Sequence, residues 1–166
     1  MRPAALPSLS LHHFSVSVPN LDEAIAWYSD TLGFQTEQRF AIDSIFAKAA
    51  FLVRESLRIE LWQIAGGAPV PDSRKEPNTD LQSGGTKHVA FLVPDLQGCL
   101  RELIHRGVDV ASVQRHPSQP MAKDSTPLDA TKAPAFAAFI RDPAGTLIEL
   151  LDRDQMRMLP PHQGAS

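Results

Sequence analysis

The sequence predicts an α+β fold built from two βαβββ modules, and three observations support this prediction. The chain contains one internal repeat, each copy opens with a strand that runs into a capped helix, and each copy ends in a pair of strands. One module alone would leave a face of its sheet open to water. Two modules can close around a shared cavity, so we expect a curved mixed sheet that encloses a site.

Two stretches of the chain match closely. The stretch HFSVSVPNL at 13–21 resembles HVAFLVPDL at 88–96, with equivalent residues 75 positions apart. In the first stretch apolar residues alternate with serine, which is the period of a β-strand. A proline follows in both copies, and because proline has no N–H to donate, it ends the strand. Each module is therefore expected to open with a short strand.

Signals for a helix follow both strands. Asn20 with Glu23 three residues later has the form of a capping box, and Gly33 stands where a helix-ending glycine is expected. In the second copy Asp95 is the expected cap and Gly107 the expected end. The residues that share an apolar helix face are Ala24, Tyr28 and Leu32 in the first copy and Leu96, Leu100, Leu103 and Ile104 in the second.

Each copy ends in two strands joined by a turn. We expect strands at 45–53 and 57–64 in the first copy, and at 135–141 and 146–151 in the second. The second pair is joined by Asp-Pro-Ala-Gly, in which the aspartate, the proline and the glycine all stand where a tight turn prefers them.

The second copy carries an insertion. RIEL at 58–61 corresponds to LIEL at 147–150, but Glu60 and Glu149 lie 89 positions apart rather than 75. About 14 extra residues therefore lie in the second copy, and they fall in 115–135, which is rich in proline and has little apolar periodicity. We predict a long surface loop there, a kind of segment that often serves as a lid or a binding loop.

The length of 166 residues suits a single domain. We expect this domain to span 1–166, with module one at about 11–64, a linker at about 65–85, module two at about 86–152 with the loop at 115–135, and a C-terminal tail at 153–166. The linker is rich in glycine, proline and aspartate, as connecting segments commonly are.

Composition excludes several classes of protein. Hydrophobic residues make up 43% of the chain and charged residues 21%, as in ordinary soluble globular proteins. The net charge of −3 is unlike the basic footprint of a nucleic-acid binder. No apolar run approaches the roughly 18 residues of a membrane span, and the first residues lack the apolar run of a signal peptide. We therefore expect a cytoplasmic protein that binds neither nucleic acid nor membrane.

Histidine and glutamate recur at equivalent places in the two copies. His13 and His88 open the first strand of each copy, and Glu60 and Glu149 lie on the last strand. Taken singly, a strand histidine is more often structural than a ligand, and a glutamate between apolar neighbours usually just faces solvent. The recurrence changes this balance, and we predict that all four side chains converge on one divalent metal ion. Two carboxylates and two imidazoles suit Ni, Co, Zn, Mn or Fe without choosing among them.

His12 competes with His13 for the role of ligand. Strand alternation would place the two side chains on opposite faces of the sheet. The repeat aligns His13 with His88, and the residue that corresponds to His12 is Lys87. We therefore choose His13 as the ligand.

Two further residues are candidates for contacts with a substrate. Trp62 would share the face of Glu60 in a regular strand, where it could line a cavity or pack in the core. His116 lies at the start of the predicted loop, from which it could touch a substrate.

Four segments together resemble the vicinal oxygen chelate superfamily, the group of glyoxalase I, the bleomycin resistance proteins and the extradiol dioxygenases. They are HHFSVSVPNLDEAIAWYSDTLGF, RIELW, GTKHVAFLVPDL and DPAGTLIELLD, and they cover residues 11 to about 152 except for the long loop. The resemblance implies paired βαβββ units that form a cupped sheet around a metal ion. It places the superfamily's metal ligands at His13, Glu60, His88 and Glu149, a set that the bleomycin-binding members lack.

The ligand set resembles that of a metal-dependent lyase or isomerase of the glyoxalase I (lactoylglutathione lyase) type, so we expect an enzyme with a small-molecule substrate. The resemblance implies proton transfer through a metal-stabilised enediolate, with Glu149 as the first choice for the catalytic base and Glu60 as the second. Two alternatives stay open: an extradiol-type ring-cleaving dioxygenase, and a metal-free protein that binds a small molecule such as an antibiotic.

The resemblance also bears on substrate and assembly. Methylmalonyl-CoA epimerases usually have glutamine at the position of Glu60, and extradiol dioxygenases generally have further histidine and tyrosine acid–base residues. The one tyrosine here, Tyr28, falls on the first predicted helix. The glutathione contacts of glyoxalase I are not recognisable around Glu60, so the substrate stays open. Family members often pair, and we expect a homodimer with the metal site in one chain or shared between two.

Overall fold

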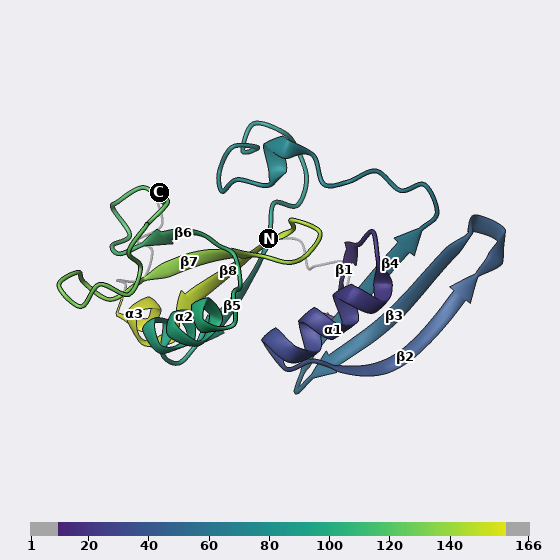
Figure 1. Cartoon of the computed structure of the whole chain (residues 1–166), viewed down its shortest axis with the longest axis horizontal. Coiled ribbons are helices and arrows are strands. Elements are labelled where there is room, and N and C mark those ends of the chain that lie inside the picture. The colour runs from purple at the N-terminus through teal and green to yellow at the C-terminus, as the bar shows by residue number, and fades with distance from the viewer. Residues whose placement is uncertain (1–9, 159–166) are drawn as a thin grey trace, which may run out of the picture. The chain divides into compact units, whose positions relative to one another are not determined.

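Two four-stranded sheets form the framework of the computed structural model, which describes residues 10–158 (Figure 1). The chain divides into an amino-terminal unit, Met1–Ala68, and a carboxy-terminal unit, Pro69–Ser166. Each unit contains a strand, a helix and three further strands in chain order. This order confirms the predicted pair of βαβββ modules and the α+β class.

The amino-terminal unit has a mixed sheet. Its elements are β1 (Phe14–Ser17), α1 (Leu21–Leu32), β2 (Gln35–Ile42), the 3-10 turn η1 (Asp43–Ile45), β3 (Ala47–Arg54) and β4 (Leu57–Ile64). The strand order is β1-β4-β3-β2, with β1 parallel to β4 and the other neighbours antiparallel. The first and last strands of the module therefore lie side by side.

The carboxy-terminal unit repeats this topology. Its elements are η2 (Asp72–Arg74), β5 (Val89–Val93), α2 (Leu96–His105), β6 (Val110–Gln114), β7 (Ala137–Arg141), β8 (Leu147–Asp152) and α3 (Arg153–Arg157). The strand order is β5-β8-β7-β6, and β5 runs parallel to β8. The short helix α3 falls in the segment predicted as a tail. The rest of that segment, 159–166, and the first residues, 1–9, lie outside the described residues.

The predicted helix boundaries are confirmed by their caps. The side chain of Asn20 accepts hydrogen bonds from the backbone N–H groups of Asp22 and Glu23, and Gly33 adopts a left-handed conformation with φ of 70°. Asp95 caps α2 by accepting from the N–H of Gly98. These local hydrogen bonds satisfy donors that a helix start leaves without an intrahelical partner.

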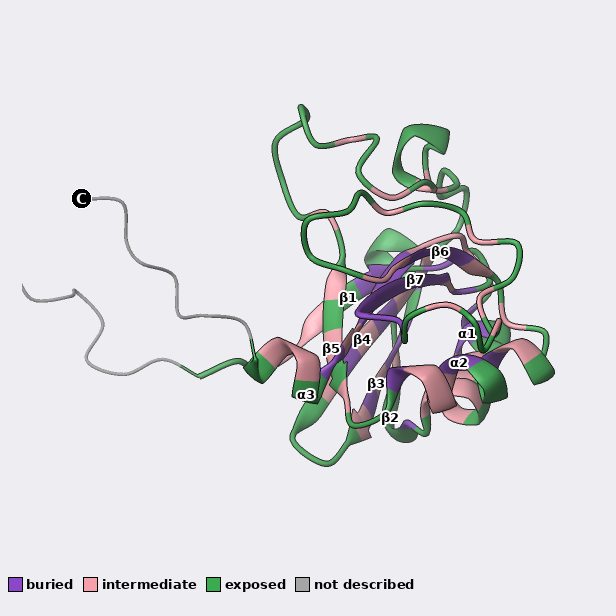
Figure 2. Cartoon of the chain, turned by 90° about the vertical axis from the view of Figure 1, so that its left-hand side faces the viewer, coloured by how far each residue is buried: buried purple, intermediate pink, exposed green. Residues whose placement is uncertain are grey.

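One face of each sheet is covered by its helix. Leu21, Ala24 and Tyr28 of α1 are buried, as are Ile59 and Leu61 of β4. Because side chains alternate along a strand, Glu60 and Trp62 of β4 lie on the opposite face. In the carboxy-terminal unit four consecutive residues of β7, 137–140, are buried, so both faces of this strand are shielded, and Figure 2 shows β7 in purple. The candidate glutamates alternate with the buried residues of β4 and β8, so they lie on the sheet face away from the helix in each unit.

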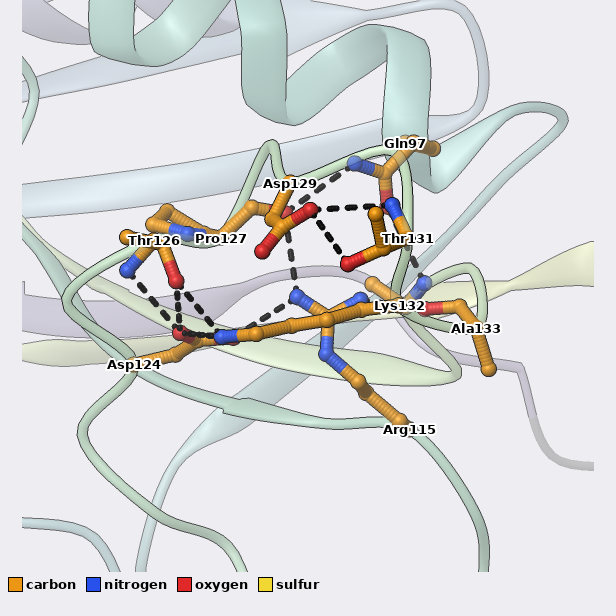
Figure 3. A network of polar contacts seen from close by, with 10 residues as sticks. Gln97, Arg115, Asp124, Thr126, Pro127, Asp129, Thr131, Lys132 and Ala133 are labelled. Carbon is orange, nitrogen blue, oxygen red and sulfur yellow. Dashed lines mark hydrogen bonds and ion pairs between the residues drawn. The ribbon is translucent and has the colours of Figure 1, made fainter.

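The segment predicted as a long loop has an ordered interior. Residues 115–136 contain neither helix nor strand, apart from one bridge between Val113 and Ala122. At the centre of the loop, Asp124 accepts hydrogen bonds from Arg115 and Lys132, each at 2.7 Å (Figure 3). The Asp124 side chain is only 12% exposed. The loop is therefore folded around a shielded carboxylate.

Two helices anchor this loop. The Gln97 side chain on α2 donates to the carbonyl of Pro127 and accepts from the N–H of Ala135, both at 3.1 Å. Gln155 on α3 donates to the carbonyl of Ala135 at 2.8 Å. The helix α3 is itself capped by the buried carboxylate of Asp152, which accepts from two of its N–H groups and also from the N–H of Leu96 at the start of α2.

Part of the predicted linker belongs to the carboxy-terminal unit. The Arg141 guanidinium on β7 donates to the Lys75 carbonyl at 2.8 Å and to the carboxylates of Glu76 and Asp109 at 2.7 Å. Only 16% of the Arg141 side chain is exposed. This arginine therefore fixes the segment around η2 to the end of β7. Among the described residues, no helix has the length and apolar character needed to cross a bilayer.

Replacing Asp124 with asparagine should lower the free energy of unfolding by about 2 kcal/mol at pH 7, because two cations lose their shared carboxylate in a shielded setting. The hydrogen bond from Lys132 is the main reason that the pKa of Asp124 lies far below its ordinary value; burial opposes this shift, and hydrogen bonds from Arg115 and Thr126 add to it. A carboxyl with a lowered folded-state pKa stabilises the fold above its unfolded-state pKa of about 4 and loses that contribution as the pH falls.

Urea unfolding of the wild type and of Asp124→Asn should therefore show a gap in stability that narrows from neutral pH to about pH 3. Asp129→Asn is the matched control, because Asp129 lies in the same loop and the hydrogen bonds to its side chain come from the exposed Thr131 rather than from a cation. A gap that stays constant with pH would contradict this account of the loop.

Candidate metal centre

Parallel pairing brings the candidate histidine and glutamate of each unit together. In the amino-terminal unit Ser15 of β1 stands opposite Glu60 of β4, and in the carboxy-terminal unit Ala90 of β5 stands opposite Glu149 of β8. The candidate histidines lie two residues before Ser15 and Ala90, immediately ahead of their strands. The two units therefore present the same pair in the same register.

The geometry of the two pairs is nearly equal. His13 Nε2 lies 3.3 Å from Glu60 Oε2, and His88 Nε2 lies 3.1 Å from Glu149 Oε2. The side chains of both histidines are 31% exposed, whereas those of the glutamates are 12% and 18% exposed. In each pair the glutamate is thus more shielded than the histidine.

A phenylalanine orients each histidine ring. Phe51 on β3 stands opposite Glu60, and its ring lies edge-on to His13 with 5.4 Å between centroids. Phe139 on β7 stands opposite Glu149 and lies edge-on to His88 at 4.9 Å. Sequence reasoning missed both phenylalanines. The available signal was an aromatic residue on the strand before the glutamate strand in each copy of the repeat.

The two carboxylates have different surroundings. The Ser15 hydroxyl donates to Glu60 Oε2 at 2.6 Å, whereas the corresponding residue in the second unit, Ala90, has no hydroxyl. Burial alone would raise the pKa of Glu60, but hydrogen bonds from Ser15 and Trp62, with the neighbouring His13, outweigh burial and hold this pKa below its usual value. Glu60 is therefore a carboxylate that its surroundings keep charged and fixed.

The prediction that the side chains of His12 and His13 lie on opposite faces of the sheet is wrong. Both histidine rings contact the same Phe51 ring, with centroids 6.1 Å away for His12 and 5.4 Å for His13, so both lie on the same side of the sheet. Their Nδ1 atoms are 2.7 Å apart. Strand alternation does not apply here, because β1 begins only at Phe14. Lys87, the counterpart of His12, is directed to Asp80 and Ser83.

The structure brings the four predicted ligands together as two pairs. Within residues 10–158, no group of three or more histidine, cysteine, aspartate or glutamate side chains is arranged to hold a metal ion. Each pair lies inside one unit. The convergence of both pairs on a single ion stays a prediction.

The other candidate residues are placed as follows. Trp62 lies on the face of Glu60, partly exposed, with its ring edge-on to Phe40 at 5.7 Å between centroids. His116 lies in the long loop, where its Nδ1 is 2.7 Å from the Ser118 hydroxyl. Tyr28 is fully buried on α1, on the helix-covered face of the sheet. Contact of Trp62 or His116 with a substrate stays a prediction.

Comparison with known proteins assigns the family. The sequence profile of the family described as Glyoxalase/Bleomycin resistance protein/Dioxygenase superfamily matches residues 12–126. The protein YwkD of Bacillus subtilis, whose function is uncharacterized, is 26% identical over 109 residues, which cover 65% of this chain and 80% of that protein.

Solved structures share the fold. The trypanothione-dependent glyoxalase I of Leishmania major aligns with a TM-score of 0.62 and 21% identity, over 90% of this chain and 91% of that chain. The fosfomycin resistance protein FosX of Listeria monocytogenes aligns with a TM-score of 0.56 and 14% identity, over 91% of this chain and 98% of that chain. At these identities the likeness establishes the fold.

Replacing Ser15 with alanine should raise the pKa of Glu60, because the carboxylate loses a hydrogen bond that favours its charged form. Titration of the Glu60 carboxyl carbon by ¹³C NMR in metal-free protein measures this shift. Ser17→Ala is the matched control, because Ser17 lies on the same face of β1 but stands opposite Trp62. An unchanged Glu60 titration in Ser15→Ala would show that the hydroxyl does not stabilise the carboxylate.

Proposed function

Because the chain belongs to the glyoxalase/bleomycin resistance protein/dioxygenase superfamily, we propose that it is a metal-dependent lyase or isomerase of the glyoxalase I type. In this proposal one divalent ion is held by His13, Glu60, His88 and Glu149, and the enzyme moves a proton next to a carbonyl of a small-molecule substrate. The observation that carries the proposal is the His–Glu pair that recurs in equal register in both units.

The donor atoms of each pair are spaced as metal ligands would be. Two ligands about 2.1 Å from one ion lie about 3.0 Å apart at an octahedral angle and about 3.4 Å apart at a tetrahedral angle. The observed separations are 3.3 and 3.1 Å. The two side chains of each pair therefore already lie at the separation that binding of an ion would require. Two imidazoles and two carboxylates suit Zn, Fe, Mn, Co or Ni.

The environments of the two carboxylates favour different roles for them. When bound, the ion would act as a Lewis acid that stabilises negative charge developing on the substrate oxygens. The Oε2 of Glu60 already accepts the Ser15 hydroxyl, which favours Glu60 as a fixed ligand. Ala90, which stands opposite Glu149, offers no such donor. We therefore assign the catalytic base to Glu149, with Glu60 as the second choice.

The neighbouring aromatic residues would complete the site. Phe51 and Phe139 fix the ring planes of the two histidines, so that the Nε2 lone pairs point in defined directions. Trp62, on the same face as Glu60 and partly exposed, would provide an apolar wall for the non-reacting part of the substrate. His116, in the long loop, is the second candidate for a substrate contact.

The placement of Tyr28 argues against a ring-cleaving dioxygenase. The chain has a single tyrosine, and it is fully buried on the face of the sheet opposite Glu60. A tyrosine acid–base residue at the site is therefore absent. Oxygen uptake with catechols and Fe(II) would nevertheless identify that activity directly.

Protein expressed with supplements of Ni, Co, Zn, Mn or Fe should retain a stoichiometric amount of one of these ions, measured by elemental analysis. His13→Ala and His88→Ala should each weaken metal affinity by at least about 100-fold, beyond the 10–100-fold typical of residues that only orient a ligand. His105→Ala, at an exposed position on α2, is the control and should keep wild-type affinity. Wild-type protein without bound metal would support a metal-free binding protein instead.

The same variants test whether the expected homodimer shares its sites. If ligands come from two chains, a mixture of His13→Ala and His88→Ala chains should regain part of the metal that each variant lacks alone. If all four ligands come from one chain, the mixture should bind no more metal than its components do.

Glu149→Gln should lower turnover by about 10²–10⁴-fold, the usual worth of a general base, while the protein keeps its metal. Glu60→Gln should cost less in turnover and more in metal affinity. Both variants should be assayed against a panel of hemithioacetals, thioesters and catechols to identify the substrate class. Unchanged turnover in Glu149→Gln would exclude this residue as the base.

A further inference from the structure

We infer that His12 is a positioning residue that orients His13 for metal binding, an inference that rests on the proposed function because it concerns the same site. The two Nδ1 atoms are 2.7 Å apart, which is hydrogen-bond distance. A metal-bound histidine generally makes a hydrogen bond through its other ring nitrogen, and this outer contact fixes both the tautomer and the ring orientation. Here that contact comes from the preceding residue in the chain.

The direction of the hydrogen bonds follows from Arg58. A guanidinium can only donate, so the 3.0 Å contact from Arg58 Nη1 makes His12 Nε2 an acceptor. A neutral His12 then carries its proton on Nδ1 and donates it to Nδ1 of His13. A neutral His13 in turn carries its proton on Nε2, next to Glu60 Oε2 at 3.3 Å. In the metal-free site the hydrogen bonds therefore run in one direction, from Arg58 through His12 to His13, whose Nε2–H faces Glu60.

Two further contacts make His12 a rigid support. Arg58 is fixed by two hydrogen bonds to the Glu37 carboxylate, at 2.8 and 2.6 Å. The His12 ring packs edge-on against Phe51 at 87°, and the same phenylalanine contacts His13. The two histidine rings are themselves nearly perpendicular, at 81° with 5.0 Å between centroids. In the metal-free protein His12 is thus held at both ring nitrogens, and its ring contact with Phe51 does not depend on where the ring proton resides.

Metal binding would require the hydrogen bond between His12 and His13 to reverse its direction. A metal ion needs the lone pair of His13 Nε2, so the His13 proton must then reside on Nδ1 and be donated to His12. His12 would carry its own proton on Nε2, facing an arginine that has only donors. The hydrogen bond between Arg58 and His12 cannot persist in that state, whereas the two bonds from Arg58 to Glu37 can.

The hydrogen bond from a neighbouring histidine is found beside His13 and not beside His88. Lys87 replaces His12 in the second copy, and its ammonium group bonds to Asp80 and to the Ser83 carbonyl rather than to His88. His88 is oriented by its ring contact with Phe139. The sequence therefore offers a comparison within one chain between a ligand with a histidine support and a ligand without one.

Two substitutions separate the hydrogen bond from the ring contact. His12→Phe keeps an aromatic ring against Phe51 but has no nitrogen, whereas His12→Asn offers an amide group that can replace Nδ1 as donor or acceptor. Isothermal titration of metal-free protein with Ni²⁺ or Co²⁺ should show affinity reduced about 10–100-fold in His12→Phe and within about threefold of wild type in His12→Asn. His105→Phe, at an exposed histidine on α2, is the matched control and should leave affinity unchanged.

A second measurement does not depend on turnover or on bound metal. ¹⁵N NMR of the metal-free protein should show His12 protonated on Nδ1 and His13 protonated on Nε2, and the His13 pattern should change in His12→Phe but not in His105→Phe. Wild-type affinity in His12→Phe, or a His13 pattern unaffected by that substitution, would overturn the role of His12. Failure of the wild type to bind metal would instead overturn the proposed function, so the two failures are distinguishable.

Discussion

The parallel pairing of the first and last strands of each module is the constraint on which the candidate site depends. It joins residues that are far apart in the sequence, such as Ser15 and Glu60, whose side chains are hydrogen-bonded across 45 positions. Parallel neighbours require a crossover, and the helix and hairpin of the module provide it. The long loop connects β6 to β7 and does not interrupt either of the paired strands β5 and β8. The insertion therefore leaves the second His–Glu pair in the same register as the first.

Short sequence patterns predicted much of the fold, whereas the side-chain contacts between neighbouring strands could not be predicted from such patterns. Caps such as Asn20 act through neighbouring backbone groups, so the sequence alone identified the helix starts. Phe51 and Phe139 were missed because a cross-strand partner depends on the register of the hairpin, which no short pattern specifies. The predicted sheet face of the His12 side chain was wrong, because strand alternation was applied to a residue that precedes β1.

The two halves of the candidate site share a geometry but differ in chemistry. Both have a histidine beside a glutamate and edge-on to a phenylalanine. Only the first half has the Ser15 hydroxyl on its carboxylate and a second histidine on its ring. After duplication, such differences allow one half to become a rigid anchor while the other retains a carboxylate with fewer partners. In the proposed enzyme this asymmetry separates holding the ion from moving the proton.

The carboxylate of Asp152 links the end of the chain to its interior. It receives the N–H groups that start α3 and also the N–H of Leu96 that starts α2, although Leu96 lies 56 positions earlier. A shortened version of the protein that stops before Asp152 would therefore lose a support of a helix near the middle of the second module. A carboxy-terminal affinity tag or fusion partner is therefore compatible with this arrangement when it follows α3 instead of replacing it.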